Sequence, residues 1–395
     1  MQRLRASVVR GWPRGRRGPM GRWAALTMVL GLALGACGAP AAAPAATDRQ
    51  NAAAPALDVS APAPVAPATT AGVQPLSPPV TVKLGVLLTL SDAGIFIAMD
   101  RGYFAEEGLE VDLTRVNGAA EAMPHLTTGQ LDAAGVTAAA GFFNAINRGL
   151  PLRIAADKGR QTPEHSSGAL ALRPDVADSG RVRDWPDLRG LALGINVPNT
   201  GTVTDIQLDR MLERGGLTRD DVQIVELAYP DMNTAFASGV IDAGYQVEPY
   251  LTLGENLGVL RRWRSLGEIT PDQYTTVWLY GPQFAETEAA YRFMVANLRA
   301  VRDYLDAFVY GRDKAAIVDI LAAHTPVKDK RLYDRMGFNA MDPDGRVMPD
   351  RIAADVQYYL SKGYIQQPVD AYQLIDSHYV DYAVARLGPY RPPSP

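Results

Sequence analysis

Cysteine is nearly absent from this sequence, because Cys37 is the single one among 395 residues. No intrachain disulfide can therefore form, and no cluster of thiolates can bind a metal. The histidines are few and scattered, with no pair at the spacing of metal ligands: His125, His165, His324 and His378. Neither a Gly-x-Ser-x-Gly motif nor a glycine-rich phosphate loop ending in Lys-Ser or Lys-Thr occurs. The sequence predicts no metal site, no cofactor and no catalytic residues, and hence a protein that is not an enzyme.

Acidic residues are absent from the first 36 positions, which carry seven arginines. The rest of the chain has 32 basic and 43 acidic residues, which gives a net charge of −11. Such a surface repels polyanions, so nucleic acid is excluded as a partner. Hydrophobic residues make up 47% of the chain and charged residues 21%. A chain of this length and composition can bury the cores of two ordinary domains.

The N-terminal apolar run extends only from Trp23 to Leu34, which is too short for a bilayer span and typical of a signal-peptide core. The next residues, Leu34-Gly35-Ala36-Cys37, resemble the bacterial lipobox, in which the cysteine is lipidated and becomes the new N-terminus. The sequence thus predicts a lipoprotein signal peptide over 1–36 and a lipid anchor on Cys37. Two or more acyl chains bind a membrane stably. The alternative is an ordinary secretory signal with an incidental cysteine.

Residues 37–79 are rich in alanine and proline and show no hydrophobic periodicity. Frequent prolines block a regular helix, so the segment is expected to be an extended tether. It would hold the folded part away from the lipid surface.

From Val80 onward, strands alternate with helices, which indicates an α/β fold with a largely parallel sheet. The pattern predicts strands over 80–88, 109–116 and 188–195, and helices over 95–104, 119–128, 203–214, 289–310, 313–324 and 349–362. The segment Gly129-Gln-Leu-Asp132-Ala recurs as Gly239-Val-Ile-Asp242-Ala, 110 positions later, which suits two similar lobes. Asp132 and Asp242 are expected to accept backbone hydrogen bonds where a helix meets a strand.

These segments resemble the solute-binding proteins of ABC importers, in the class that covers nitrate, sulfonate, taurine and thiamine-pyrimidine binders. The similarity is carried by Met99-Asp-Arg-Gly-Tyr-Phe-Ala-Glu-Glu-Gly-Leu, Asp187-Leu-Arg-Gly-Leu and Asp242-Ala-Gly-Tyr-Gln-Val-Glu-Pro249. The resemblance implies a type II periplasmic-binding-protein fold with two lobes and a ligand cleft between them. Lobe 1 would comprise 80–172 and return over 275–395, lobe 2 would comprise 173–274, and crossovers near Leu170 and Tyr274 would form the hinge.

Ligands of open parallel α/β sheets bind beyond the carboxyl ends of the strands. The candidate loops there are 91–96, 137–141, 199–202, 246–250 and 275–280, and the first and third offer backbone N–H groups for an anion or a polyol. Ser91 and Asp92 are alternatively helix caps, and Trp278 is alternatively a core residue. The predicted ligand-binding residues are Ser91, Asp92, Phe96, Thr137, Asn199, Thr200, Thr202, Tyr245, Glu248, Tyr250, Trp278 and Tyr280.

None of these loops contains arginine or lysine, which argues against a small anion as ligand. Aromatic faces with scattered donors and acceptors suit a flat heterocycle with polar edges. Within the family the sequence most resembles the riboflavin-binding lipoproteins of bacterial riboflavin importers, with binders of a thiamine pyrimidine precursor as the close alternative. Another small solute of the same family, such as a sulfonate or nitrate, is a further alternative. Trp278 is the first choice for the stacking partner. The resemblance implies a membrane permease and its ATPase as partners and an extracytoplasmic, membrane-anchored location.

A pyrimidine synthase of the same fold, which carries pyridoxal phosphate on a lysine and has a cysteine-rich signature, is the distant alternative. That signature is absent here.

Overall fold

The computed structural model describes residues 74–393. The predicted signal peptide, the predicted lipidation at Cys37 and most of the predicted tether lie outside the described residues. Within 74–393, no helix combines the length and the apolar character that a membrane crossing requires.

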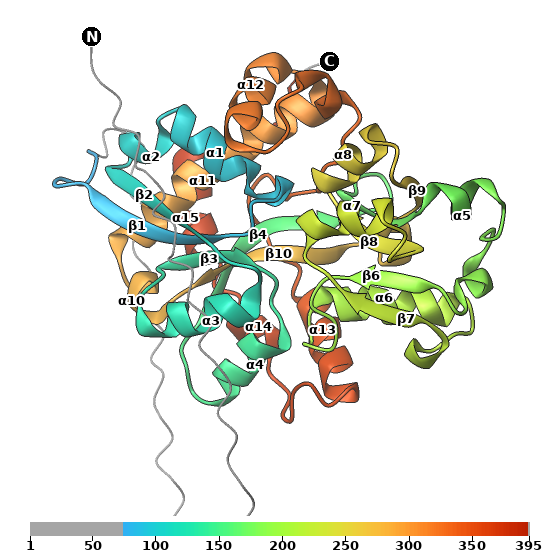
Figure 1. The fold of residues 1–395 in the computed structure, drawn as a ribbon. Coiled ribbons are helices and arrows are strands. Elements are labelled where there is room, and N and C mark those ends of the chain that lie inside the picture. Colours follow the sequence, from blue (N-terminus) through green and yellow to red (C-terminus); the bar gives the residue numbers. More distant parts are fainter. Residues whose placement is uncertain (1–73, 394–395) are drawn as a thin grey trace, which may run out of the picture. The chain divides into compact units, whose positions relative to one another are not determined.

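The described chain forms two lobes, each built on one mixed sheet (Figure 1). In each sheet, three neighbouring strands run parallel and the fourth in spatial order is antiparallel to both of its neighbours. The sheet of lobe 1 has the spatial order β2 (Leu109–Arg115), β1 (Val80–Val86), β3 (Ala133–Val136), β10 (Gln273–Tyr280) and β4 (Arg153–Gln161). The sheet of lobe 2 has the order β7 (Gln223–Glu226), β6 (Ala192–Ile195), β8 (Ala243–Val247), β5 (Gly168–Leu172) and β9 (Arg261–Ser265). The two orders correspond strand by strand, which confirms the predicted α/β fold with two lobes.

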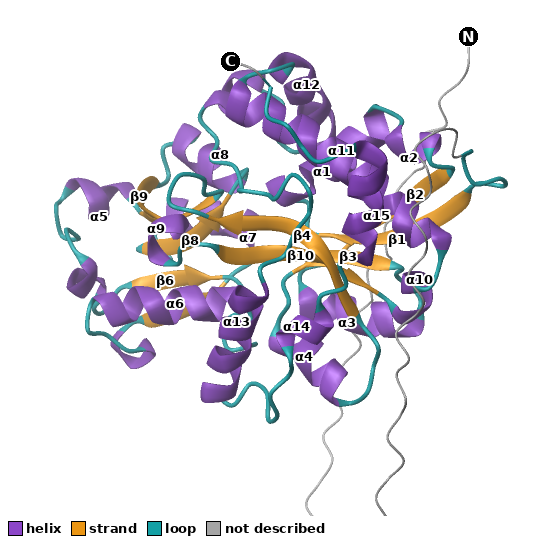
Figure 2. Cartoon of the chain, turned by 180° about the vertical axis from the view of Figure 1, so that it is seen from behind, coloured by secondary structure: helices purple, strands orange, loops and turns teal. Residues whose placement is uncertain are grey.

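Helices cover both faces of each sheet (Figures 1 and 2). One face of the lobe 1 sheet packs on α1 (Ala93–Asp100), α2 (Tyr103–Glu106), α10 (Pro282–Ala285), α11 (Glu288–Tyr310), α12 (Lys314–His324) and α15 (His378–Leu387). The other face packs on α3 (Ala119–Thr128), α4 (Ala140–Asn147), α13 (Pro349–Ser361) and α14 (Ala371–Leu374). In lobe 2, α5 (Pro174–Asp178), α6 (Val203–Arg214) and α9 (Leu266–Ile269) cover one face, and α7 (Tyr229–Ala237) and α8 (Tyr250–Asn256) cover the other. Short 3-10 helices are η1 (Leu90–Asp92), η2 (Trp185–Leu188), η3 (Arg219–Asp221) and η4 (Lys330–Asp334).

The repeated aspartates occupy equivalent corners of the two lobes. Asp132 Oδ2 accepts a hydrogen bond from Lys83 N at 2.8 Å, and Asp242 Oδ2 accepts one from Ala192 N at 3.0 Å. Each aspartate therefore ties the entry of one strand to the backbone of its parallel neighbour. The predicted structural role of both residues is confirmed.

The two crossovers between the lobes lie earlier in the chain than the sequence predicted. β5 pairs with β8 and β9, so residues 168–172 belong to lobe 2 and not to lobe 1. The crossovers are the segments between β4 and β5 and between β9 and β10. The helix α13 packs on lobe 1 and also on α6 of lobe 2. There the Tyr358 hydroxyl donates to Asp209 Oδ2 at 2.9 Å, so the C-terminal return contacts both lobes.

Candidate ligand-binding site

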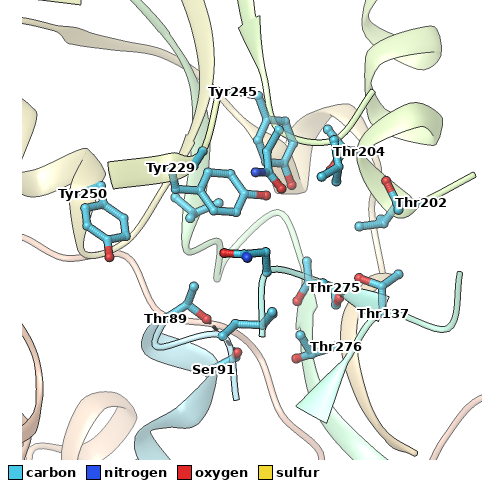
Figure 3. Close-up of a pocket in the computed structure, with 18 of the residues that line it drawn as sticks. Thr89, Ser91, Thr137, Thr202, Thr204, Tyr229, Tyr245, Tyr250, Thr275 and Thr276 are labelled. Carbon is cyan, nitrogen blue, oxygen red and sulfur yellow. Dashed lines mark hydrogen bonds between the residues drawn. The ribbon is translucent and has the colours of Figure 1, made fainter. Parts of the chain in front are cut away.

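A cavity of about 250 Å³ lies between the two lobes, at the carboxyl ends of β1, β2, β3, β6, β7 and β8. Its walls also include the ends of the crossover strands, through Gln161, Ser167, Thr275 and Thr276. The cavity thus lies where the rule for open parallel sheets places a ligand. In Figure 3, three tyrosines of lobe 2 face hydroxyl-bearing side chains of lobe 1 across this space.

The same four-residue pattern follows the strand that is second in the spatial order of each sheet. Thr89-Leu-Ser-Asp92 follows β1, and Thr202-Val-Thr-Asp205 follows β6. In both, the aspartate Oδ2 accepts a hydrogen bond from the threonine N–H, at 3.2 Å in lobe 1 and 3.1 Å in lobe 2. This is a capping arrangement that starts the next helix. The third residues, Ser91 and Thr204, then line the cavity from opposite lobes.

The loop over 199–202 does not offer open N–H groups, contrary to the sequence-based expectation. The Asp205 carboxylate accepts hydrogen bonds from Asn199 N at 2.7 Å and Gly201 N at 2.9 Å, and also from Thr200 N and Thr202 N. Asp205 is fully buried and forms an ion pair with Arg219 at 2.9 Å. A carboxylate of the chain therefore holds the donors that would otherwise bind an anion. Asn199 and Thr200 lie outside the cavity lining, whereas Thr202 lines it.

Three tyrosines form the aromatic wall: Tyr229, Tyr245 and Tyr250. The rings of Tyr229 and Tyr245 are stacked, with centroids 6.2 Å apart and an interplanar angle of 29°. Burial raises the pKa of Tyr229 to about 12, and it also raises the pKa values of Tyr245 and Tyr250. The hydroxyls therefore stay protonated at neutral pH and present apolar faces with neutral polar tips. Sequence reasoning missed Tyr229, which lies at the carboxyl end of β7.

Trp278 and Tyr280 are core residues outside the cavity lining, so the prediction that they bind the ligand is wrong and the alternative interpretation of Trp278 holds. Both are 0% exposed. The side chains of β10 alternate between the two faces of the sheet. Trp278 and Tyr280 therefore pack in the cluster of α11, where Trp278 Nε1 donates to Asn297 Oδ1 at 3.2 Å. Phe96 is also buried away from the cavity, stacked on His324 with centroids 5.0 Å apart.

Both predicted acidic site residues are satisfied by partners within the protein. Asp92 is fully buried, outside the cavity lining, and pairs with Lys158 Nζ at 2.5 Å. Glu248 lines the cavity, but its carboxylate accepts from Arg262 at 2.7 Å, Thr252 N at 3.0 Å and Gly337 N at 3.1 Å. These contacts neutralise Glu248 and tie lobe 2 to the C-terminal return of the chain. Neither carboxylate is left to bind a cationic ligand.

The remaining polar groups of the lining are mostly neutral hydroxyls and amides. Thr276 Oγ1 and Thr202 Oγ1, on residues that are 3% and 9% exposed, have no hydrogen-bond partner within the described structure. Buried hydroxyls without partners are rare, so these two groups are candidates for ligand contact. Thr137 also lines the cavity, with its hydroxyl donating to Thr275 O at 2.7 Å. Arg115 and Glu226 are exposed charged residues in the wall.

The cavity does not fit a lysine-bound aldehyde cofactor such as pyridoxal phosphate. No lysine is among the residues that line it, and the buried Lys158 behind the wall is engaged with Asp92. The four N–H groups that could hold a phosphate are occupied by Asp205. The site therefore has neither the amine nor the phosphate cradle of that chemistry.

Comparison with solved structures identifies the fold that this chain shares. The ligand-binding component of an ABC-type import system from Staphylococcus aureus aligns with a TM-score of 0.62 and 13% identity, over 77% of this chain and 98% of that one. The periplasmic nitrate-binding protein NrtA from Synechocystis PCC 6803 aligns with a TM-score of 0.63 and 16% identity, over 78% of this chain and 89% of that one. These similarities confirm the predicted periplasmic-binding-protein fold.

The sequence comparisons give a family. A 4-amino-5-hydroxymethyl-2-methylpyrimidine phosphate synthase from Aspergillus parasiticus is 29% identical over 161 residues, which are 40% of this chain. The chain spans 42% of the length of that curated relative. The family described as NMT1/THI5 like matches residues 90–307, which is more than half of the sequence. The chain therefore belongs to the NMT1/THI5-like family.

Proposed function

We propose that this protein is the solute-binding component of an ABC importer and that it captures riboflavin. It would be held at the extracytoplasmic face of the cell membrane by a lipid on Cys37 and would deliver its ligand to a membrane permease, which an ATPase drives. The observation that carries the proposal is the lining of the interlobe cavity. Three tyrosine faces oppose neutral hydroxyls and amides, and the buried carboxylates are already paired.

This lining favours an uncharged heterocycle that carries a polyol. An isoalloxazine ring offers a flat face to the tyrosines, and a ribityl chain offers hydroxyls to Thr202 and Thr276, whose own hydroxyls lack partners. Nitrate and sulfonate would need open donors or unpaired buried cations. The loop donors are held by Asp205, and the buried Lys158 is held by Asp92. We infer that anions of this kind are not the ligand.

A thiamine pyrimidine precursor is the second candidate, and two observations favour it. The curated relatives are named as pyrimidine phosphate synthases. The cavity volume of about 250 Å³ lies just under the range of roughly 300–1,000 Å³ for drug-sized ligands, which suits a single-ring compound. An enzymatic role is disfavoured because no lysine lines the cavity.

A ligand panel tests the proposal. The full chain in detergent is heated with riboflavin, with 4-amino-5-hydroxymethyl-2-methylpyrimidine, with nitrate and with an alkanesulfonate. A true ligand at a hundredfold excess over its dissociation constant stabilises the folded state by roughly 2.7 kcal/mol. We expect stabilisation by riboflavin and quenching of its fluorescence at micromolar protein. Stabilisation by the pyrimidine alone would favour the second candidate, and stabilisation by an anion alone would contradict both.

A further inference from the structure

Lys158 is a buried cation directly behind the cavity wall. It lies on β4, is 3% exposed, and directs its ammonium group at the η1 segment. Lys158 Nζ contacts Asp92 Oδ1 at 2.5 Å, Ser91 O at 2.9 Å and Ser91 Oγ at 3.4 Å. Gly135 on β3, which is separated from β4 by β10, leaves room for this side chain, because a Cβ at Gly135 would lie 2.2 Å from Lys158 Cε. Asp92 and Lys158 do not line the cavity, whereas Ser91 does.

The hydrogen-bond directions in this cluster follow from the chemistry of the groups. An ammonium has only donors, so Ser91 Oγ must accept from Lys158. Ser91 Oγ also lies 2.9 Å from Thr89 Oγ1, and both residues line the cavity (Figure 3). The two hydroxyls carry two protons, and one of them lies in the bond between the oxygens. The second proton has no acceptor among the described residues, whichever hydroxyl donates in the shared bond.

We infer that Lys158, paired with Asp92, is a positioning residue that makes the Ser91–Thr89 pair a hydrogen-bond donor to the ligand. The ligand then presents an acceptor atom of its heterocycle, a carbonyl oxygen or an unprotonated ring nitrogen, to this side of lobe 1. The inference rests on the proposed function, because it assumes that the cavity takes an uncharged heterocycle. Lobe 1 would thus select a heterocycle that has a hydrogen-bond acceptor at the edge facing Ser91 and Thr89.

A double-mutant cycle on riboflavin affinity separates positioning from a structural role. Lys158 and Asp92 are replaced together (K158M/D92N), because removing one of them leaves a buried charge unpaired. The replacement is made in the wild-type chain and in the Ser91→Ala chain. We expect the double replacement to weaken riboflavin binding about fivefold in the wild type, the size of one reoriented hydrogen bond. In the Ser91→Ala chain, which lacks the hydroxyl that accepts from Lys158, it should leave the affinity unchanged.

The control is a second ion pair of lobe 1 that lies away from the cavity. Arg302 and Asp344 are 2.6 Å apart, and R302M/D344N should leave the affinity unchanged in both backgrounds. Equal losses from K158M/D92N in the two backgrounds would show that the pair acts through the fold alone, which would overturn the inference. If the wild type does not bind riboflavin, the riboflavin proposal fails, and the same cycle is measured with 4-amino-5-hydroxymethyl-2-methylpyrimidine.

A neutron crystal structure of the unliganded full chain tests the hydrogen-bond directions without any ligand. We expect a deuteron of Lys158 Nζ directed at Ser91 Oγ, and one hydroxyl deuteron of the Ser91–Thr89 pair directed into the cavity. A Ser91 deuteron directed at Lys158 Nζ, or both hydroxyl deuterons directed at protein acceptors, would overturn the inference even where ligand binding is confirmed.

Discussion

The two lobes meet at Gly201, and this contact yields a quantitative prediction about closure. Gly201 O accepts a hydrogen bond from Ala140 N of lobe 1 at 2.7 Å. Gly201 has φ +68°, and a Cβ there would lie 2.5 Å from Ala140 Cβ and 3.0 Å from Tyr364 Cγ. Carbon atoms in favourable contact are about 3.5–4.0 Å apart. Gly201→Ala therefore requires the lobes to separate by roughly 1 Å at this point.

The cost of Gly201→Ala divides into two parts. A non-glycine residue in the left-handed region costs roughly 1–2 kcal/mol, and this applies whether the lobes are together or apart. Overpacking costs about 1–3 kcal/mol and applies only while the lobes are in contact. If the ligand is held between contacting lobes, only the second part weakens binding. We expect a loss of riboflavin affinity of about 5- to 150-fold.

Gly216→Ala is the matched control, because Gly216 has φ +62° and no atom within 4 Å of its hypothetical Cβ. It carries the backbone strain without the contact. Riboflavin fluorescence titrations give the affinities of both variants, and small-angle scattering gives the radius with and without ligand. The wild type and Gly216→Ala should become more compact on binding, and Gly201→Ala should not. Equal affinities and equal compaction in the two variants would refute the role of this contact in binding.

Three further predictions concern the wall, the core and the anchor. Tyr245→Ala and Tyr229→Ala should each weaken riboflavin binding about 5- to 150-fold, since stacking on one ring contributes roughly 1–3 kcal/mol. Trp278→Phe, a change in the core, should lower the melting temperature without changing the affinity. Titrations in which Trp278→Phe binds riboflavin more weakly than the tyrosine variants would contradict this. Burial raises the pKa of Asp355 to about 7, so the folded protein keeps a proton that the unfolded chain releases near pH 4. The free energy of unfolding should then fall between pH 4 and 7, by up to roughly 4 kcal/mol for this group. Denaturation curves at pH 5 and 8 should show a smaller fall for Asp355→Asn than for the wild type. An equal fall in the two proteins would disprove the prediction. Cys37→Ser should release the protein from the membrane fraction or leave its signal uncleaved, and an unmodified Cys37 in the membrane-bound protein, seen by mass spectrometry, would count against the anchor.

The local elements were predictable because their signals are local. The helix over 203–214 has the bounds that its capping residues and apolar spacing predict, and α11 begins one residue before the predicted start. The corner aspartates, Asp132 and Asp242, were also recognised, because each follows a helix-ending glycine and precedes a buried strand. Such features depend on a few neighbouring residues, and the sequence contains all of them.

The assignment of strands to lobes was less predictable. The segment Gly168–Leu172 is uniformly apolar and buried, so its sequence is compatible with a buried strand in either sheet. The same uniformity misled the interpretation of β10, in which Val277, Trp278 and Leu279 are all buried. A strand buried on both faces shows no alternation, so the sequence does not reveal which side chains face the cavity and which face α11.

The position of Tyr229 in the cavity wall is explained by the order of the strands in the lobe 2 sheet. Tyr229 lies just beyond the carboxyl end of β7, a strand that was not among those predicted. Because β7 pairs in parallel with β6, their carboxyl ends lie at the same edge of the sheet. The loop after β7 therefore faces the same cavity as the loop over 196–202. Once that strand is recognised, the rule that located the other loops locates Tyr229 as well.

In the proposed function, the charge of the ligand depends on two aspartates, Asp92 and Asp205. Asp92 and Asp205 occupy the last position of the Thr-x-(Ser/Thr)-Asp pattern that follows β1 in lobe 1 and β6 in lobe 2. Asp205 takes the N–H groups of its loop, and Asp92 neutralises Lys158. In a fold whose strand ends and helix starts favour anions, the chain thus supplies its own anion in each lobe. The third residues of the same pattern, Ser91 and Thr204, line the cavity together with the tyrosines, and their hydroxyls are open to a ligand. Neutral donors facing aromatic rings suit the neutral heterocycle that we propose as ligand, and in that proposal the pattern that starts two helices also sets the charge of the ligand.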